Sequence, residues 1–391
     1  MTDSPIDSPI VWQDAARAQA FAAWLQACIP SHGLLPQTLH PASADASFRR
    51  YFRVRTEAGA SCIIMDAPPA QEDCQPFVKV AELMANAGLN APRVLAWDQA
   101  QGFMLLSDLG ARTMLELIDA QPDAEREQCA YPLYREAVET LIRWQLASRA
   151  DVLPPYDEAL LSRELALFPD WYMQKHRGIV IDSTLQDKLD GLFAQIKASN
   201  LQSLGGARVY VHRDFMPRNL MVANQFSDGL PLGKLAPMQD ERGSATPKAH
   251  AVTSVGAPSL GVLDFQDAVY GPITYDIASL MRDAFVSWPE DFVLEITVRY
   301  WEQARKAGLP VGDDFGEFYR AVEWMGLQRH LKILGIFARL TLRDGKPKYL
   351  ADTPRFISYA RNTCARYRQL GPLMVLLDEI EGNETRVGYT F

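Results

Sequence analysis

The chain lacks the long uncharged hydrophobic run from which a membrane-spanning helix is built, because charged residues interrupt its apolar stretches before they reach that length. Its first residues include Asp3 and Asp7, where a secretory signal would carry basic residues. These absences argue against an integral membrane protein. They predict a cytoplasmic protein with no membrane partner.

Cysteine is also scarce. The five cysteines are scattered, odd in number and never arranged as C-x-x-C: Cys28, Cys62, Cys74, Cys129 and Cys364. This pattern indicates neither a disulfide framework nor a zinc site, and it predicts reduced structural thiols.

Basic residues are in the minority, since 39 Lys and Arg face 48 Asp and Glu for a formal net charge of −9. A broad surface for nucleic acid or anionic lipid is therefore not expected, although a local basic patch for nucleotide phosphates is compatible with this balance. We expect small-molecule partners, no nucleic acid and no obligate protein partner.

What the chain does have is length for a sizeable core, because 391 residues with 48% hydrophobic content suffice for two or three packed units. The N-terminal part alternates strand-like runs with two amphipathic helices. Helices are expected over 12–28, ending before Pro30 and Gly33, and over 76–87, closed by Gly88; strands are expected over 47–55, 62–65, 92–97 and 103–106.

Beyond Leu109 the periodicity becomes helical, with long amphipathic stretches near 131–149 and 186–199 and further helices to about residue 380. The sequence therefore predicts an α+β protein with a small β-rich N-terminal lobe, residues 1–108, and a mostly helical C-terminal lobe, residues 109–391. A segment at about 224–258, rich in Gly, Pro, Ser, Ala and charge, is interpreted as an insertion. It is either a surface loop with no catalytic role or a lid over a nucleotide.

Two short motifs carry the chemistry: His212-x-Asp214-x-x-x-x-Asn219 and Asp264-Phe-Gln-Asp267. In the first pattern the aspartate accepts the proton of a substrate hydroxyl, and the asparagine turns back to hold Mg²⁺. Phosphoryl transfer needs a second carboxylate near the metal, because the phosphate charge must be neutralised. The motifs predict Asp214 as the catalytic residue, with Asn219 and Asp264 as ligands of Mg²⁺ and its bound ATP.

These motifs resemble those of the aminoglycoside and choline phosphotransferase superfamily, whose members share a two-lobe protein-kinase-like fold. The resemblance spans most of the chain and is strongest at 211–219, 261–267 and 271–279. It implies that His212 and Asp276 support the catalytic loop, with Asp276 hydrogen-bonding back to the strained loop backbone. The alternative for Asp276 is an acid stabilised only by the dipole of its own helix.

Within the superfamily, residues 46–53 and 65–69 resemble bacterial kinases that act on the anomeric hydroxyl of N-acetylmuramate and N-acetylglucosamine in peptidoglycan recycling. The resemblance implies ATP-dependent phosphorylation of the C1 hydroxyl, which yields an α-1-phosphate.

The chain departs from the superfamily pattern at the lysine that binds the α- and β-phosphates, because Met65 stands near that position. We expect arginines to replace it, since Arg49, Arg50 and Arg53 crowd the nucleotide loop and guanidinium groups bind phosphate bidentately. Strand alternation prevents Arg49 and Arg50 from facing one side together, and either can instead be a solvated edge residue. Ser47 adds a donor for the phosphates.

The adenine is expected against the backbone of Leu105, Leu106 and Ser107, between the lobes. Apolar residues at such positions can equally belong to the core.

Acceptor recognition is expected from four polar or aromatic residues: Asp267, Trp171, Arg329 and His330. Asp267 can bind a sugar hydroxyl or make a structural hydrogen bond, and Trp171 can stack on a sugar or belong to the core. A cation at Arg329 or His330 can meet the lactyl carboxylate of N-acetylmuramate or make an interhelical contact.

Three functions remain open: a sugar 1-kinase, a kinase for another small alcohol such as an aminoglycoside, choline or a homoserine-like acceptor, and a noncatalytic pseudokinase. The intact set of Asp214, Asn219 and Asp264 disfavours the third. The absence of a dense acidic block disfavours a polycationic acceptor, so the sugar kinase is preferred.

Overall fold

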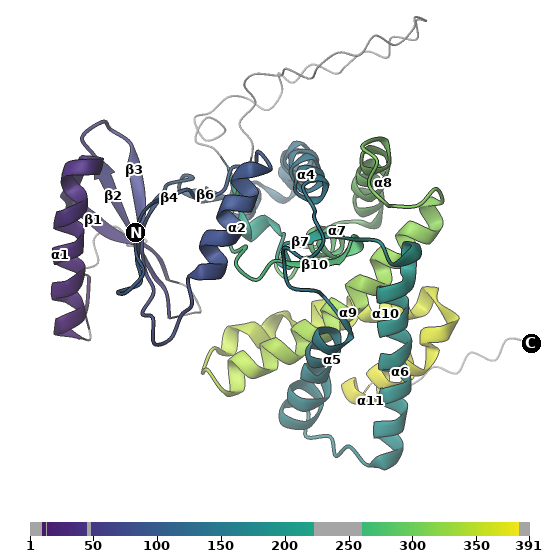
Figure 1. Cartoon of the computed structure of the whole chain (residues 1–391). Coiled ribbons are helices and arrows are strands. Elements are labelled where there is room, and N and C mark those ends of the chain that lie inside the picture. Colours follow the sequence, from purple (N-terminus) through teal and green to yellow (C-terminus); the bar gives the residue numbers. More distant parts are fainter. Residues whose placement is uncertain (1–9, 13, 45–47, 223–259, 383–391) are drawn as a thin grey trace, which may run out of the picture. The chain divides into compact units, whose positions relative to one another are not determined.

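The computed structural model describes residues 10–12, 14–44, 48–222 and 260–382. By packing, the chain divides into two compact units, 1–121 with 220–267 and 122–219 with 268–391 (Figure 1). The predicted lobes are instead continuous in sequence, at 1–108 and 109–391. The boundary between them stays a prediction. Ser47 and the predicted insertion at 224–258 lie outside the described residues.

The first unit is built on a five-stranded antiparallel sheet in the order β1-β2-β3-β5-β4. Its elements are α1 (Ala15–His32), β1 (Leu34–Ala44), β2 (Arg50–Thr56), β3 (Ser61–Asp66), α2 (Gln75–Asn86), β4 (Val94–Asp98), β5 (Phe103–Ser107), β6 (Arg112–Thr113) and α3 (Met114–Asp119). Helix α1 covers one face, where Phe21 and Leu25 pack on Phe52, Val54 and Ile64. The predicted alternation of β2 therefore buries Phe52 and Val54 together.

One prediction in this unit was wrong, and one strand was missed. Helix α1 continues through Pro30 to His32 and ends where Gly33 adopts φ 55° and donates its N–H to the Ile29 carbonyl at 2.8 Å. Strand β1 was missed because Pro36 and Pro41 argue against a strand interior. It forms an edge of the sheet with register irregularities, where proline is tolerated because no second neighbour needs its N–H.

A second, three-stranded sheet of the first unit joins β6, β8 (Leu220–Val222) and β9 (Gly261–Val262). Gly261 lies so close to its neighbours that an added Cβ would stand 2.9 Å from Cδ1 of Leu109. The Val262 N–H donates to the Asn90 carbonyl at 2.8 Å, and Phe77 of α2 packs on Phe265 with ring centroids 4.9 Å apart. These contacts fix the segment that carries Asp264.

The second unit is mostly helical, with one antiparallel strand pair. Its elements are α4 (Asp123–Leu146), α5 (Glu158–Leu167), a π-helix (Phe168–His176), α6 (Ser183–Gln202), β7 (Arg208–Val211), β10 (Val269–Pro272), α7 (Thr274–Met281), α8 (Glu290–Lys306), α9 (Phe315–Leu342), α10 (Thr353–Arg366) and α11 (Gly371–Glu381). Strand β10 was not predicted from the sequence. The fold is the two-lobe kinase-like α+β class that the motifs predicted.

Helix α9 is the central element of this unit and packs on α5, α6, α7 and α10 (Figure 1). Gly335 permits its closest approach, because a Cβ there would stand 2.2 Å from the Leu167 carbonyl oxygen. The middle of α9 therefore runs directly beside α5 and α7, whose side chains it meets in a buried polar cluster.

No helix in the described part of the chain is long and apolar enough to cross a membrane. All five cysteines are free and buried. This burial is compatible with the predicted structural role of the thiols.

We expect Asp66 to anchor α1 to the sheet. Its carboxylate, 1% exposed, accepts hydrogen bonds from the Nε atoms of Arg17 and Arg50, both at 3.0 Å. Asp66→Asn should lower the free energy of unfolding by about 2–3 kcal/mol, because two charge-assisted interactions weaken together.

Denaturant unfolding measures this change, with Asp313→Asn as the matched control. Asp313 is 91% exposed in its pair with Arg305, so its loss should cost less than about 1 kcal/mol. Equal effects of the two substitutions would contradict the anchoring role.

Candidate active site

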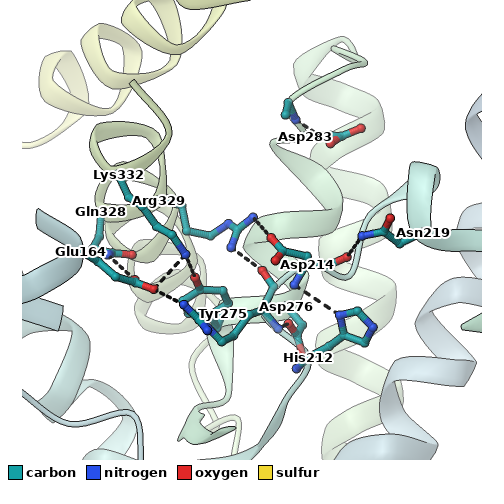
Figure 2. Close-up of polar contacts among 12 residues, drawn as sticks. Glu164, His212, Asp214, Asn219, Tyr275, Asp276, Asp283, Gln328, Arg329 and Lys332 are labelled. Carbon is teal, nitrogen blue, oxygen red and sulfur yellow. Dashed lines mark hydrogen bonds and ion pairs between the residues drawn. The ribbon is translucent and has the colours of Figure 1, made fainter. Parts of the chain in front are cut away.

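The catalytic loop follows β7 and contains a backbone conformation that L-residues rarely adopt. Arg213 has φ 79°, in the left-handed region. The buried carboxylate of Asp276, from α7, accepts the N–H of His212 at 2.7 Å and the N–H of Arg213 at 3.0 Å (Figure 2). The hydrogen bonds expected of Asp276 are therefore present, and they secure the loop at its strained residue.

Side chains of the loop also bond to its own backbone. Nδ1 of the buried His212 accepts the Asp214 N–H at 3.3 Å, and Nδ2 of Asn219 donates to the Asp214 carbonyl at 2.9 Å (Figure 2). The Asp214 side chain keeps 38% of its surface exposed. The loop thus presents the Asp214 carboxylate while its backbone is held from both ends.

Glu164 of α5 is the centre of a buried ionic cluster beneath the loop. Its carboxylate contacts Lys332 Nζ at 2.8 Å and the Arg213 guanidinium at 2.6 Å. It also accepts from Gln328 Nε2 at 3.0 Å (Figure 2). A further hydrogen bond comes from the Tyr156 hydroxyl at 2.6 Å. One anion from α5 therefore binds the loop to two residues of α9.

The pKa values in this cluster follow from burial and charge. Burial raises the pKa of Glu164, but the cations Lys332 and Arg213 outweigh it and hold the pKa well below its ordinary range. The pKa of Asp214 is likewise lowered, since Lys332 and Arg329 outweigh its burial. Asp276 shows the opposite balance, because burial raises its pKa to about 7 despite its two backbone hydrogen bonds.

Arg329 lies under the loop, only 4% exposed. Its guanidinium donates to the Arg213 carbonyl at 2.5 Å, approaches Asp214 Oδ1 at 3.7 Å and stacks over the Tyr275 ring at 4.7 Å. This position does not favour the predicted direct contact with an acceptor carboxylate.

In the first unit, Asp264 directly follows the β9 region and also has a positive φ, 62°. The Gln266 side-chain amide donates to Asp264 Oδ1 at 2.9 Å, which orients the carboxylate. Asp267 follows in the same segment. Of the four described non-glycine residues with a positive φ, Asp151, Leu204, Arg213 and Asp264, the last two stand in the motifs that the sequence singled out.

The donor chemistry of the predicted metal ligands suits Mg²⁺, which prefers oxygen and keeps several water and phosphate ligands of its own. Asp264 offers a carboxylate. Asn219 offers its Oδ1, because its Nδ2 donates to Asp214. Among the described residues no group of three or more His, Cys, Asp or Glu side chains gathers as an all-protein cation site.

The arginines expected at the phosphates have partners within the first unit. Arg50 binds Asp66 and stacks over the Trp12 ring at 4.0 Å, which places it on the α1 face. This pairing does not favour Arg50 as a phosphate ligand. Arg49 pairs with Glu72 at 3.0 Å, and Arg53 with Asp108 at 2.6 Å.

Met65, at the expected lysine position, is fully buried. At the predicted adenine backbone, Leu105 and Leu106 are buried, and Ser107 Oγ accepts the N–H of Arg93, the residue before β4, at 2.9 Å.

Two of the residues predicted to bind the acceptor pack against other side chains of the protein. Trp171 lies in the π-helix with the Lys175 ammonium 3.5 Å from its ring centroid. His330 is buried against the Tyr359 and Phe356 rings, and burial lowers its pKa to about 3. Neither surrounding indicates contact with an acceptor. Asp267 belongs to the first unit.

Sequence reasoning missed Glu164, Gln328 and Lys332. The sequence did contain a pattern that could have indicated them. Glu164 is a carboxylate inside an apolar helical stretch, and Gln328 and Lys332 are polar residues spaced i, i+4 on one face of α9. Only the packing of α5 on α9 reveals that they meet.

Comparison with known proteins gives consistent matches. The family described as "Phosphotransferase enzyme family" matches residues 38–230 and 252–314. The chain is 44% identical over 371 residues to an N-acetylmuramate/N-acetylglucosamine kinase of Pseudomonas aeruginosa, covering 93% of this chain and 97% of that protein. It is 44% identical to a protein of the same name from Neisseria meningitidis, covering 94% and 97%.

Solved structures agree on the fold. An amicoumacin kinase in complex with AMP-PNP and Ca²⁺ superposes with a TM-score of 0.55 at 14% identity, covering 87% of this chain and 92% of that one. At this identity the likeness concerns the fold alone.

We expect Glu164 to make stability depend on acid pH. Because its pKa is lowered in the fold, it contributes stability above its unfolded pKa of about 4.5, and this contribution is lost as the pH falls. At neutral pH, Glu164→Gln should lower the free energy of unfolding by about 3–5 kcal/mol, since two buried cations lose their partner.

Denaturant unfolding at pH 7, 5 and 3.5 measures the effect, and the gap between the native protein and the variant should narrow at acid pH. Glu158→Gln on the same helix is the matched control, because Glu158 is 70% exposed in its pair with Lys197. A difference in unfolding free energy between the native protein and Glu164→Gln that does not change with pH would contradict the lowered pKa of Glu164.

Proposed function

Because the chain belongs to the phosphotransferase enzyme family, we propose that it transfers the γ-phosphoryl group of ATP to the anomeric C1 hydroxyl of N-acetylmuramate and N-acetylglucosamine. The observation that carries this proposal is the 44% identity, over nearly the whole chain, to proteins named for kinase activity on these two sugars. The intact catalytic loop, with Asp214 presented and its backbone secured, supports it.

The residues divide the work as the chemistry of phosphoryl transfer requires. Asp214 orients the C1 hydroxyl and accepts its proton as the oxygen attacks phosphorus. Asn219 and Asp264 are the protein ligands for Mg²⁺, which when bound neutralises phosphate charge. His212 and Asp276 hold the loop in place and take no part in the chemistry.

On the nucleotide side, we propose Ser47 and Arg49 as phosphate contacts and the backbone of Leu105 to Ser107 as the adenine contact. Arg49 shares the strand face of Tyr51 and Arg53, whereas Arg50 is engaged with Asp66 on the α1 face. We therefore propose a structural role for Arg50.

On the acceptor side, Asp267 remains the proposed hydroxyl ligand. We place the reaction in the cytoplasm, as a step of peptidoglycan recycling, with no nucleic acid, membrane or obligate protein partner. Five free, buried cysteines are compatible with that reducing compartment.

Purified protein incubated with Mg-ATP should release ADP with N-acetylmuramate and with N-acetylglucosamine, and not with choline or an aminoglycoside. A coupled ADP assay over this panel measures it. Transfer only to choline or the aminoglycoside would replace the proposal by a kinase for another small alcohol. ATP binding without transfer to any of the four would contradict the proposed activity and favour a pseudokinase.

Two substitutions separate the roles within the site. Asp214→Asn should reduce kcat by at least about 10²-fold while the protein still binds nucleotide, because only the proton acceptor is lost. Asp264→Ala should abolish Mg²⁺-dependent nucleotide binding, measured by calorimetry. Asp313→Asn, at an exposed site, is the control and should leave both unchanged. Near-native turnover of Asp214→Asn would exclude it as the catalytic residue.

A further inference from the structure

Arg329 is the one site prediction whose surroundings point to a different role from the one that the sequence suggested. The sequence offered it as a cation for the acceptor's carboxylate. In the structure Arg329 is 4% exposed, and its guanidinium is surrounded by the Arg213 carbonyl, the Asp214 carboxylate and the face of Tyr275. This burial leaves little access for a ligand.

These contacts give Arg329 two points of action on the same loop. Its hydrogen bond to the Arg213 carbonyl, at 2.5 Å, secures the peptide that links the strained residue to Asp214. Its second nitrogen stands 3.7 Å from Asp214 Oδ1, close enough for a direct electrostatic effect with no hydrogen bond to compete for the acceptor hydroxyl.

We propose that Arg329 is a positioning residue for Asp214, which it holds as an oriented carboxylate under the acceptor hydroxyl, and that it does not bind the acceptor's own carboxylate. The inference rests on the proposed function, because it assigns a role within the same catalytic site.

The charges around Asp214 come from every element packed beneath the loop. They are Arg329 and Lys332 of α9, His212 and Arg213 of the loop, Tyr275 and Asp276 of α7, and Glu164 of α5. Glu164 already pairs with Lys332 and Arg213, so much of their charge is compensated. In the described part of the chain, the ion pair that Arg329 makes is with Asp214, at 3.7 Å. Its removal should therefore act on Asp214 directly.

Arg329 stands on the Oδ1 side of the Asp214 carboxylate and forms no hydrogen bond to it, so the carboxylate can still accept a hydrogen bond from the acceptor hydroxyl. An anomeric hydroxyl is more acidic than an ordinary alcohol, because the ring oxygen withdraws electrons from C1. In the reaction the C1 oxygen forms a bond to the γ-phosphorus, the bond from that phosphorus to the ADP oxygen breaks, and the hydroxyl proton passes to Asp214. The proton then leaves Asp214 for water, which restores the carboxylate.

Kinetics of Arg329→Gln and Arg329→Lys with both sugars test the proposal. N-acetylmuramate carries a carboxylate and N-acetylglucosamine does not, so the pair separates positioning from binding. We expect Arg329→Gln to lower kcat by about 10- to 100-fold equally for the two sugars, with little change in KM. Arg329→Lys should restore most of the lost kcat, because it returns a positive charge beside Asp214.

Arg320→Gln is the matched control, since it removes the same charge from the same helix where the guanidinium stacks on Trp324. A rise in KM for N-acetylmuramate alone would overturn the proposal, because it would mark Arg329 as an acceptor ligand. A loss of kcat that Arg329→Lys does not restore at all would also overturn it, because it would indicate only a structural role.

A measurement without substrate keeps this inference separate from the proposed function. In protein labelled with carbon-13 at the aspartate carboxyls, the Asp214 signal is identified by its loss in Asp214→Asn. At neutral pH this signal should move in Arg329→Gln, because the guanidinium beside the carboxylate is lost, and stay unchanged in Arg320→Gln. An Asp214 signal unaffected by Arg329→Gln would refute the role of Arg329, whereas failure to phosphorylate either sugar would refute only the proposed function.

Discussion

The site depends on one carboxylate, that of Asp276, which accepts two consecutive backbone N–H groups at the turn of the catalytic loop. Arg213 cannot keep its left-handed conformation without compensation, because such strain costs on the order of 1–3 kcal/mol. Burial raises the pKa of Asp276 to about 7, which means that keeping this carboxylate ionised itself costs free energy. Everything that presents Asp214 follows from this arrangement.

A buried group of charged residues links the loop to the helices beneath it. Glu164 joins Arg213 to Lys332 and Gln328, and Arg329 joins the Arg213 carbonyl to Asp214. All three α9 residues lie within two turns of a helix that Gly335 allows to pack closely on α5. Buried charge of this kind is weak support for stability but strong support for a unique geometry, which a catalytic loop requires.

The sequence was informative where the functional residues lie close together along the chain. The motifs around Asp214 and Asp264, the alternation of β2 and the two-lobe α+β class could all be predicted in this way. It was less informative where distant segments meet. It did not indicate that Arg50 pairs with Asp66 of the neighbouring strand, or that Arg329 contacts the Arg213 carbonyl of another segment. Edge strand β1 was hidden by its prolines.

The central claim is that the chain phosphorylates the anomeric oxygen, and the bond that forms can be observed directly. A phosphorus–proton correlation spectrum of the product made from Mg-ATP and N-acetylglucosamine should show the new phosphate coupled to the proton on C1. Coupling to the C6 protons, or no new phosphate ester, would contradict the claim.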